Sequence, residues 1–322
     1  MTGVSKDAPV IFLNMFEAYK NHILLHFIIL LFGFTGILGK LIDLDAVSMV
    51  FHRVLIASVS LFIFMLILKR PLKVQSRKRF VGICLTGLVV GAHWITFFQA
   101  VQLSTASFGV LCLSTTTLHV SWLEPLVMKR KFSKLEFGLS LVVVLGIFLV
   151  TEEFSGNQLK ALFFGLTSAL LAATFSVFNA KYAQTEKPST ITLYEMIMAT
   201  VAIAILLAAT GNFNTNLWAI SVEDIGWLLF LGIVCTSFAF LAIVELVKHL
   251  GAFTVSLSIN LEPVYAIVLG ILILNENQKL GMQFYLGSVI IVLVIFANAI
   301  LKSYLKKKKN SSNMVLDKDL DA

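Results

Sequence analysis

Long apolar runs separated by short connections dominate the sequence and constrain its fold more than any motif does. Each run approaches the length of about 20 residues that an α-helix needs to cross the hydrocarbon core of a bilayer. With 58% hydrophobic and 13% charged residues among 322, the chain has more apolar surface than a soluble domain of this length can bury. We therefore predict an all-α integral membrane protein with ten transmembrane helices. The predicted spans are residues 22–41, 46–68, 80–101, 106–128, 137–150, 161–183, 191–209, 225–247, 252–274 and 282–301.

Positive charges lie almost entirely in alternate connections between these runs. The other set of connections contains only Lys40, Lys160 and Lys279, and Arg53 lies within a run. Because lysine and arginine stay on the cytoplasmic side of membrane proteins, this distribution predicts a multi-pass membrane protein with both termini in the cytoplasm. The net charge of +7 then reflects topology, and we expect no nucleic-acid partner.

The two halves of the chain share a weak internal similarity. The fourth run holds three threonines, 115–117, and the ninth holds Leu-Glu-Pro, 261–263; a polar turn, a glycine and another apolar run follow each. Five helices per half is an odd number, so the second half must enter the membrane from the opposite face. We predict an inverted five-plus-five repeat with a shared site near the midplane. Its parts are a cytoplasmic segment, 1–21, a first repeat, 22–150, a second repeat, 161–301, and a cytoplasmic tail, 302–322.

The ninth run carries polar residues at a depth where lipid tolerates them poorly. Glu262 and Pro263 lie near its middle, and Asn260 lies on the same turn. A carboxylate at the bilayer centre costs about 2.5 to 3.5 kcal/mol, and proline deprives one helical carbonyl of its partner. Such groups occur in membranes chiefly where they face a protein cavity, which predicts a binding site here. The alternative is a kink that only shapes packing, with Glu262 bonded to a neighbouring helix.

Two other runs contain ionisable or amphipathic residues. Arg53, about a third of the way into the second run, can bind an anionic substrate, pair with a carboxylate or extend to the outer headgroups. His93 and Trp94 lie near the middle of the third run. A histidine on an apolar helix is more often a packing group than a ligand, but at the midplane an imidazole can also exchange protons or contact cargo.

Two acidic residues lie near the cytoplasmic ends of their runs. Water can reach Glu195 there. Glu124 precedes Pro125 beside a basic turn, which predicts a helix end where Glu124 pairs with Lys129 or Arg130. The candidate substrate or ion cavity comprises Glu262, Asn260, Pro263, His93, Trp94, Arg53, Thr116 and Glu195.

The sequence contains no motif of a soluble enzyme. The stretch from Gly33 to Lys40 has the wrong glycine spacing for a phosphate-binding loop, and Leu41 stands where Ser or Thr is needed. No His-Glu-x-x-His pair, Gly-x-Ser-x-Gly elbow or Cys/His cluster with zinc spacing occurs. We expect no catalytic residue, no metal site and no cofactor. Uphill transport would then use a proton or ion gradient, or the gradient of the substrate itself.

These features together resemble the drug/metabolite transporter superfamily, in particular its EamA-type members. The resemblance rests on ten short-looped helices in two halves, Pro263 within the ninth run, Asn275-Glu276 at its end and Gly287 opening the last. It implies a cytoplasmic-membrane carrier with an inverted five-plus-five repeat that moves a small metabolite, often an amino acid or related compound, outward. Arg53 looks like the arginine that this family commonly has in its second span.

The first half departs from the family pattern. Residues 115–117 stand where a mid-span proline is expected, and Lys129 or Arg130 stands where a Gly-Glu pair is usual. The two halves are therefore expected to bend differently.

The resulting hypothesis is a secondary transporter that exports a small metabolite by alternating access and is not an enzyme. Its expected partners are a small-molecule substrate, protons or another coupling ion, and the lipid bilayer, and it is expected to be a monomer or homodimer. Two alternatives remain. One is a non-transporting membrane subunit or receptor; the other is a lipid-modifying membrane enzyme, which would need a nucleophile or metal set that the sequence does not offer.

Overall fold

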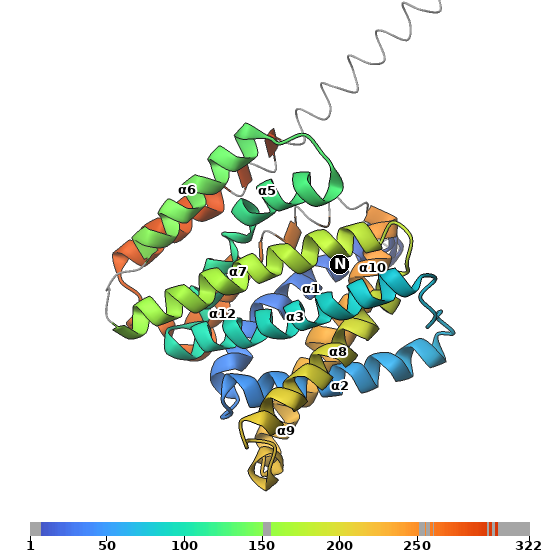
Figure 1. Cartoon of the computed structure of the whole chain (residues 1–322). Coiled ribbons are helices and arrows are strands. Elements are labelled where there is room, and N and C mark those ends of the chain that lie inside the picture. Colours follow the sequence, from blue (N-terminus) through green and yellow to red (C-terminus); the bar gives the residue numbers. More distant parts are fainter. Residues whose placement is uncertain are drawn as a thin grey trace, which may run out of the picture.

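The fold is entirely helical in the part of the chain that the structure describes. The computed structural model describes residues 8–150, 156–250, 255, 258–259, 261–294, 296–297 and 300–301. Seven helices there are long and apolar enough to cross a membrane, and two shorter apolar helices, Glu262–Leu274 and Met282–Val294, follow them (Figure 1). The predicted all-α, multi-pass class is confirmed, while the count of ten spans stays a prediction.

The helices have the following bounds. They are α1 (Ala8–Leu41), α2 (Ala46–Ile67), α3 (Arg77–Leu103), α4 (Ala106–Leu113), α5 (Thr116–Met128), α6 (Lys134–Val150), α7 (Gly156–Tyr182), α8 (Pro188–Ala209), η1 (Thr215–Trp218), α9 (Val222–Leu229), η2 (Phe230–Phe238), α10 (Ala239–Leu250), α12 (Glu262–Leu274) and η3 (Glu276–Gln278). The segments η1 and η3 are 3₁₀ helices, and η2 is a π-helix.

Local sequence accounts for where several helices begin. The carboxylate of Asp45, just before α2, accepts hydrogen bonds from the backbone N–H groups of Val47 (2.9 Å) and Ser48 (3.1 Å). Thr105 and Ser221 cap α4 and α9 with their hydroxyls in the same way. Each cap satisfies N–H groups that the first turn of a helix leaves without a partner.

The helices differ from the predicted spans in three places. α1 begins at Ala8, inside the segment expected to precede the first span. The fourth span is divided at Ser114–Thr115 into α4 and α5, and the eighth span is divided by the π-helix η2. At the first division, Ser114 N–H donates to Leu111 O and Thr115 N–H to Cys112 O, in the tighter 3₁₀ pattern. An apolar run predicts a span, but not such changes in its backbone bonding.

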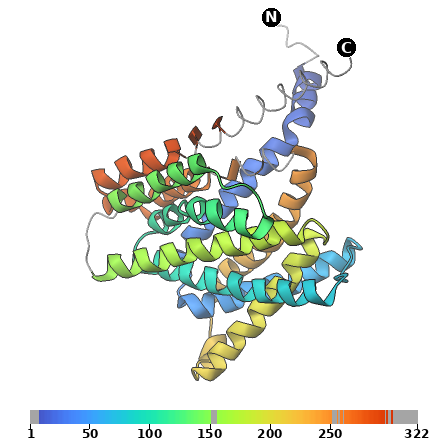
Figure 2. The same cartoon turned by 45° about the horizontal axis from the view of Figure 1, so that its top comes forward.

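The two halves of the chain pack in reciprocal pairs. α1 packs on α12 as α7 packs on α5, and α2 packs on η2 as α8 packs on α3. α2 and α8 also pack on each other. Figure 1 and Figure 2 both show α3 and α7 side by side, and α6 beside the helix 282–294, where Gly146 meets Ile291. Each half therefore completes its packing on the other.

Polar contacts at the ends of helices define two opposite ends of the bundle. At the end called here the Lys40 face, Lys40 Nζ donates to Gln102 O (3.1 Å), and Gln102 Nε2 donates to Leu44 O (2.7 Å). At the end called the Arg79 face, Thr190 Oγ1 at the start of α8 donates to Pro71 O just beyond the end of α2 (2.5 Å). α2 therefore runs from the Lys40 face to the Arg79 face.

Candidate substrate cavity

A cavity of about 410 Å³ lies between the two halves of the chain. Its wall takes side chains from α1 to α5, α7, α8, α10 and the start of α12. This volume suits a small metabolite. Asn260 lies outside the described residues. The other sequence-predicted site residues all line the cavity, and their role in binding stays a prediction: Arg53, His93, Trp94, Thr116, Glu195, Glu262 and Pro263.

Arg53 is held inside the protein by a hydroxyl and an aromatic ring. Its side chain is 3% exposed, its Nε donates to Thr236 Oγ1 (3.1 Å), and its Cζ lies 3.9 Å from the centroid of the Trp94 ring. Stacking on an indole stabilises a cation without neutralising it. Nη1 has no hydrogen-bond partner within the described part of the chain. Of the expected alternatives, extension to the headgroups does not describe this structure.

The π-helix η2 supplies the hydroxyl that holds Arg53. Thr236 Oγ1 donates to Leu231 O, five residues earlier (2.8 Å). The next residue, Ser237, contacts Ser60 of α2 through their hydroxyls (2.8 Å). π-helical turns are rare and often lie at functional sites. This element was not predicted from the sequence, where its one signal is a Thr-Ser pair in an otherwise apolar stretch.

Glu195 is buried against the side-chain amide of Asn179, which was not among the predicted site residues. Its side chain is 2% exposed, and Asn179 Nδ2 donates to its Oε2 (3.2 Å). Within the described residues, neither Glu195 Oε1 nor Asn179 Oδ1 has a partner. The expectation that water reaches Glu195 is wrong for this structure because α3 covers it: a Cβ at Gly87 would lie 2.7 Å from Glu195 O. Asn179 follows a long apolar stretch of α7, which is the signal that could have identified it.

His93 ties α3 to α7. Its Nδ1 lies 3.0 Å from Ser168 O and 2.9 Å from Ser168 Oγ, and that hydroxyl donates to His93 O (3.1 Å). The imidazole also packs on Phe175, with 5.3 Å between ring centroids. This geometry favours the packing interpretation of His93, with the ring forming part of the cavity wall.

The breaks in the fourth and ninth spans meet the cavity. Glu262 is the first residue of α12 and is half-buried, and it interacts electrostatically with Arg53 without forming an ion pair. Pro263 lies at the N-terminal turn of α12. At the other break, Thr116 Oγ1 donates to Ala169 O (3.3 Å), while the buried Ser114 Oγ has no partner among the described residues. Ser114 was not among the predicted site residues.

The polar atoms left without partners are concentrated at this cavity. Among the described residues, the buried side-chain atoms with no hydrogen bond are Arg53 Nη1, Ser114 Oγ, Asn179 Oδ1 and Glu195 Oε1, and all four residues line the cavity wall. Native proteins pair nearly all buried polar atoms. A bound molecule with both acceptor and donor groups could form the hydrogen bonds that these four atoms lack.

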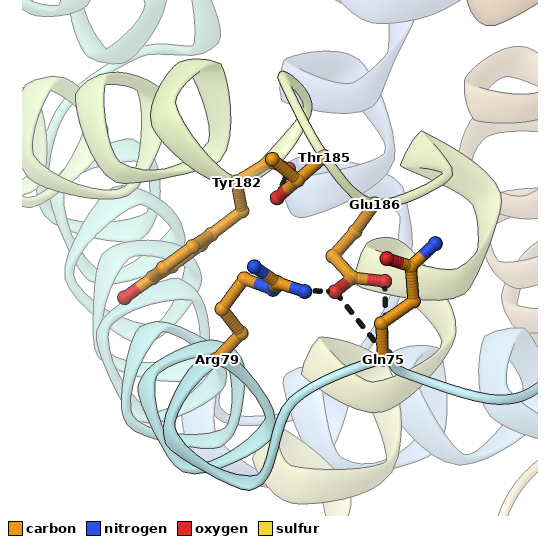
Figure 3. A network of polar contacts seen from close by, with 5 residues as sticks. All are labelled: Gln75, Arg79, Tyr182, Thr185 and Glu186. Carbon is orange, nitrogen blue, oxygen red and sulfur yellow. Dashed lines mark hydrogen bonds and ion pairs between the residues drawn. The ribbon is translucent and has the colours of Figure 1, made fainter.

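Buried carboxylates close the bundle at both faces. On the Lys40 face, Glu276 Oε1 accepts from Ala106 N–H (2.7 Å), and its Oε2 accepts from the N–H (3.2 Å) and hydroxyl (2.5 Å) of Ser107, at the start of α4. On the Arg79 face, Glu186 accepts from Gln75 N–H and from Arg79 Nε (2.6 Å), just before and within α3. Figure 3 shows Arg79 and Glu186 pointing toward each other. Both carboxylates belong to the second half of the chain and hold helix starts of the first.

Two further sequence-based expectations concern ions. The predicted pairing of Glu124 at a helix end is confirmed, because Arg130 Nη1 lies 2.6 Å from Glu124 Oε1. Within the described residues, no group of three or more His, Cys, Asp or Glu side chains is placed to hold a metal ion.

A multi-pass helical bundle around a mixed polar and aromatic cavity is compatible with a membrane carrier. The EamA-like transporter family model matches this chain twice, over residues 20–152 and 159–300. The chain therefore belongs to the EamA-like transporter family, within the drug/metabolite transporter superfamily.

Similar proteins are consistent with this assignment. A protein of Clostridium kluyveri described as an uncharacterized transporter is 23% identical over 240 residues, which cover 72% of this chain and 76% of that protein. Another uncharacterized transporter, from Archaeoglobus fulgidus, is 24% identical over 265 residues, covering 80% of this chain and 90% of that protein. A protein of known crystal structure, 14% identical, shares the fold with a TM-score of 0.60 over 86% of this chain and 95% of that chain.

Proposed function

We propose that the protein is a secondary transporter that exports a small metabolite, an amino acid or related compound, across the cytoplasmic membrane by alternating access. The observation that supports this most strongly is the cavity between the two halves, whose wall carries four buried polar atoms without partners. A sealed structural core would leave few such atoms. A cavity that takes up and releases a polar guest needs them.

The proposal includes ten spans in an inverted five-plus-five repeat. Three observations support it: the family model matches two consecutive segments, the helices pack in reciprocal pairs, and α5 and α12 end alike. α5 ends at Lys129 (φ 54°) and α12 at Asn275 (φ 51°), both in the left-handed region that closes a helix. The concentration of basic residues in alternate loops supports a cytoplasmic Arg79 face, with both termini on that side.

The two faces would act as gates. With the Arg79 face in the cytoplasm, Glu276 closes the outer gate by capping α4, and the Glu186–Arg79 pair lies at the inner gate. Alternating access requires that the two gates open in turn around a fixed site.

Within this mechanism, Glu262 is the proposed protonatable or cargo-binding group. It is half-buried in the cavity wall, at the start of α12, and close enough to Arg53 for the two charges to interact. A carboxylate in such a site can gain and release a proton as the cavity changes its access to water. Protons are thus the coupling ion that we propose.

The proposal is tested with Glu262→Gln, which keeps the shape of the side chain and removes its charge. In reconstituted vesicles the variant should transport poorly, or lose the pH dependence of transport, while its amount in the membrane is unchanged. Glu124→Gln, which removes a carboxylate from the exposed pair with Arg130, is the matched control. Unchanged uptake kinetics across pH in the Glu262 variant would argue against this role.

The cargo is best found by comparing metabolites of cells that lack the protein with those of cells that overproduce it. Compounds that differ are then tested for thermal stabilisation of purified protein, because a ligand that binds the folded state raises the unfolding temperature. A receptor or helper subunit would bind such a compound without moving it. Vesicles that bind the compound but do not accumulate it would therefore contradict the transport proposal.

A further inference from the structure

Arg53 and Glu195 occupy matching places in the two halves of the chain. Each is the eighth residue of a 22-residue helix, α2 (Ala46–Ile67) and α8 (Pro188–Ala209). Each backbone is also approached closely by a glycine of the other half: a Cβ at Gly232 would lie 3.2 Å from Arg53 O, and one at Gly87 2.7 Å from Glu195 O. The match places a cation in one half where the other half has a carboxylate.

The two helices run in opposite directions. His52 Nε2, near the start of α2, lies 2.9 Å from Leu217 O, beyond the end of α8. Thr190 Oγ1, at the start of α8, donates to Pro71 O, beyond the end of α2. Each helix therefore starts where the other ends. Arg53 lies toward the Lys40 face, and Glu195 lies toward the Arg79 face.

The register of the helices gives the separation of the two charges. Ser58 Oγ and Thr200 Oγ1 lie 3.1 Å apart where α2 and α8 cross, each five residues beyond its charged residue. At a rise of 1.5 Å per residue, five residues on each side of the crossing separate the two Cα atoms by about 15 Å.

A second pair of helices gives a similar separation. α3 and α7 are antiparallel, because Ser104 after α3 bonds to Gln158 at the start of α7, and they are in register at His93 and Ser168. Trp94, whose ring stacks on Arg53, lies one residue from His93 toward the Lys40 face. Asn179, whose amide donates to Glu195, lies eleven residues from Ser168 toward the Arg79 face. At a rise of about 1.5 Å per residue, these offsets place Trp94 and Asn179 about 18 Å apart along the helices.

We propose that the cavity selects an elongated zwitterion, with a protonated amine at one end and an anionic group at the other. This inference rests on the proposed transport function. An ammonium group has three donors and can satisfy both Glu195 Oε1 and Asn179 Oδ1, while Arg53 Nη1 donates to the anionic end. Aromatic side chains of the wall, including Phe97 and Phe175, suit an apolar chain between the ends.

An α-amino acid whose side chain carries no cationic group does not meet this geometry. Its amine and carboxylate are attached to one carbon, so it reaches the Arg53 end or the Glu195 end but not both. A compact zwitterion would instead bind at Arg53 and Glu262, whose charges interact. The two modes make opposite predictions for isomers that differ only in where the amine is attached.

The test compares 6-aminohexanoate with its isomer 2-aminohexanoate on the purified full-length protein, by calorimetry or thermal shift. We expect 6-aminohexanoate to bind about tenfold more tightly or better, the ratio that one lost hydrogen bond to a charged group produces. Hexanoate and hexylamine, each with one of the two charged ends, should both bind more weakly than 6-aminohexanoate. Equal binding of the isomers, tighter binding of 2-aminohexanoate, or binding of neither isomer would overturn the inference.

Variants locate the amine. Glu195→Gln should lower the affinity for 6-aminohexanoate about tenfold and leave that for hexanoate unchanged, whereas Glu124→Gln should change neither. Loss of the isomer preference in Glu262→Gln but not in Glu195→Gln would overturn the assignment. If Glu195→Gln does not fold, the isomer comparison on the unmodified protein still decides. Transport of a metabolite found in cells, without discrimination between the isomers, would retain the proposed function and reject the elongated cargo.

Discussion

The fourth and ninth spans are both interrupted, but by different chemistry. In the fourth, Thr115 Oγ1 donates to Cys112 O (2.8 Å) and Thr117 Oγ1 to Ser114 O (3.0 Å), so hydroxyls bond carbonyls at the break. In the ninth, α12 begins at Glu262, with Pro263 in its first turn. A threonine break keeps every backbone N–H, whereas a proline break removes one. Interruptions at corresponding places of a repeat therefore do not require the same residue.

The two interrupted spans are joined at the Lys40 face. Glu276 follows α12 and caps α4, the first segment of the fourth span. Its buried carboxylate accepts hydrogen bonds from N–H and O–H donors and lies at the N-terminus of α4, where the helix dipole stabilises a negative charge. The ninth span thus stabilises the break in the fourth, although no proline marks that break.

Removing this link should have the largest effect on stability. Glu276→Gln places an amide donor against Ala106 N–H and the Ser107 donors, so at least one bond to a charged acceptor is lost without replacement. We expect the free energy of unfolding to fall by about 2 to 3 kcal/mol. Thermal unfolding of purified protein measures it. Glu124→Gln, at an exposed ion pair, should change the free energy of unfolding by less than about 1 kcal/mol. Equal losses in the two variants would mean that the cap of α4 stabilises the fold no more than an exposed ion pair does.

The hydroxyl break should depend on its threonine. Thr115 is fully buried, and Thr115→Val keeps nearly the same shape while removing the hydrogen bond to Cys112 O. We expect a loss of about 1 kcal/mol in the free energy of unfolding. Thr115→Ser, which keeps the hydroxyl, is the control for the bond. A valine variant as stable as the serine variant would show that the break does not rest on this hydroxyl.

The proline break should be less sensitive. Pro263 occupies the N-terminal turn of α12, where its fixed φ suits a helix and its missing N–H would be free anyway. Pro263→Ala should therefore cost only about 0.4 to 1 kcal/mol, mainly by raising the entropy of the unfolded chain. Chemical denaturation at equal protein-to-detergent ratio measures this. A loss above that for Thr115→Val would reverse the ranking of the two breaks.

The smallest effect is expected at Thr116. Its hydroxyl reaches Ala169 O across 3.3 Å, a long contact between α5 and α7. Thr116→Val should alter the unfolding free energy by less than about 0.5 kcal/mol. If its loss matches that of Thr115→Val, the contact to α7 is as important as the local bond within the break.

The sequence predicts what depends on composition along one helix. Apolar length gives the spans, and Pro263 and the basic turn beside Glu124 give a break and an ion pair that the structure contains. The fourth-span break depends on side-chain bonding to the backbone, and the burial of Glu195 depends on the close approach of α3 at Gly87. These features arise between elements, so periodicity in one run does not reveal them.

The hydroxyl contact between Ser58 and Thr200 has a mechanical consequence. Each hydroxyl also lies within hydrogen-bond distance of a carbonyl of its own helix, Val54 O (2.7 Å) and Met196 O (2.8 Å). A hydroxyl that donates its single proton across the 3.1 Å gap therefore shares or gives up its bond to that carbonyl. Either hydroxyl can be the donor, so the contact has two proton arrangements, one with the donor in each half of the chain. In the alternating-access mechanism proposed above, a contact that can exchange its donor in this way would serve as the point about which one half tilts over the other.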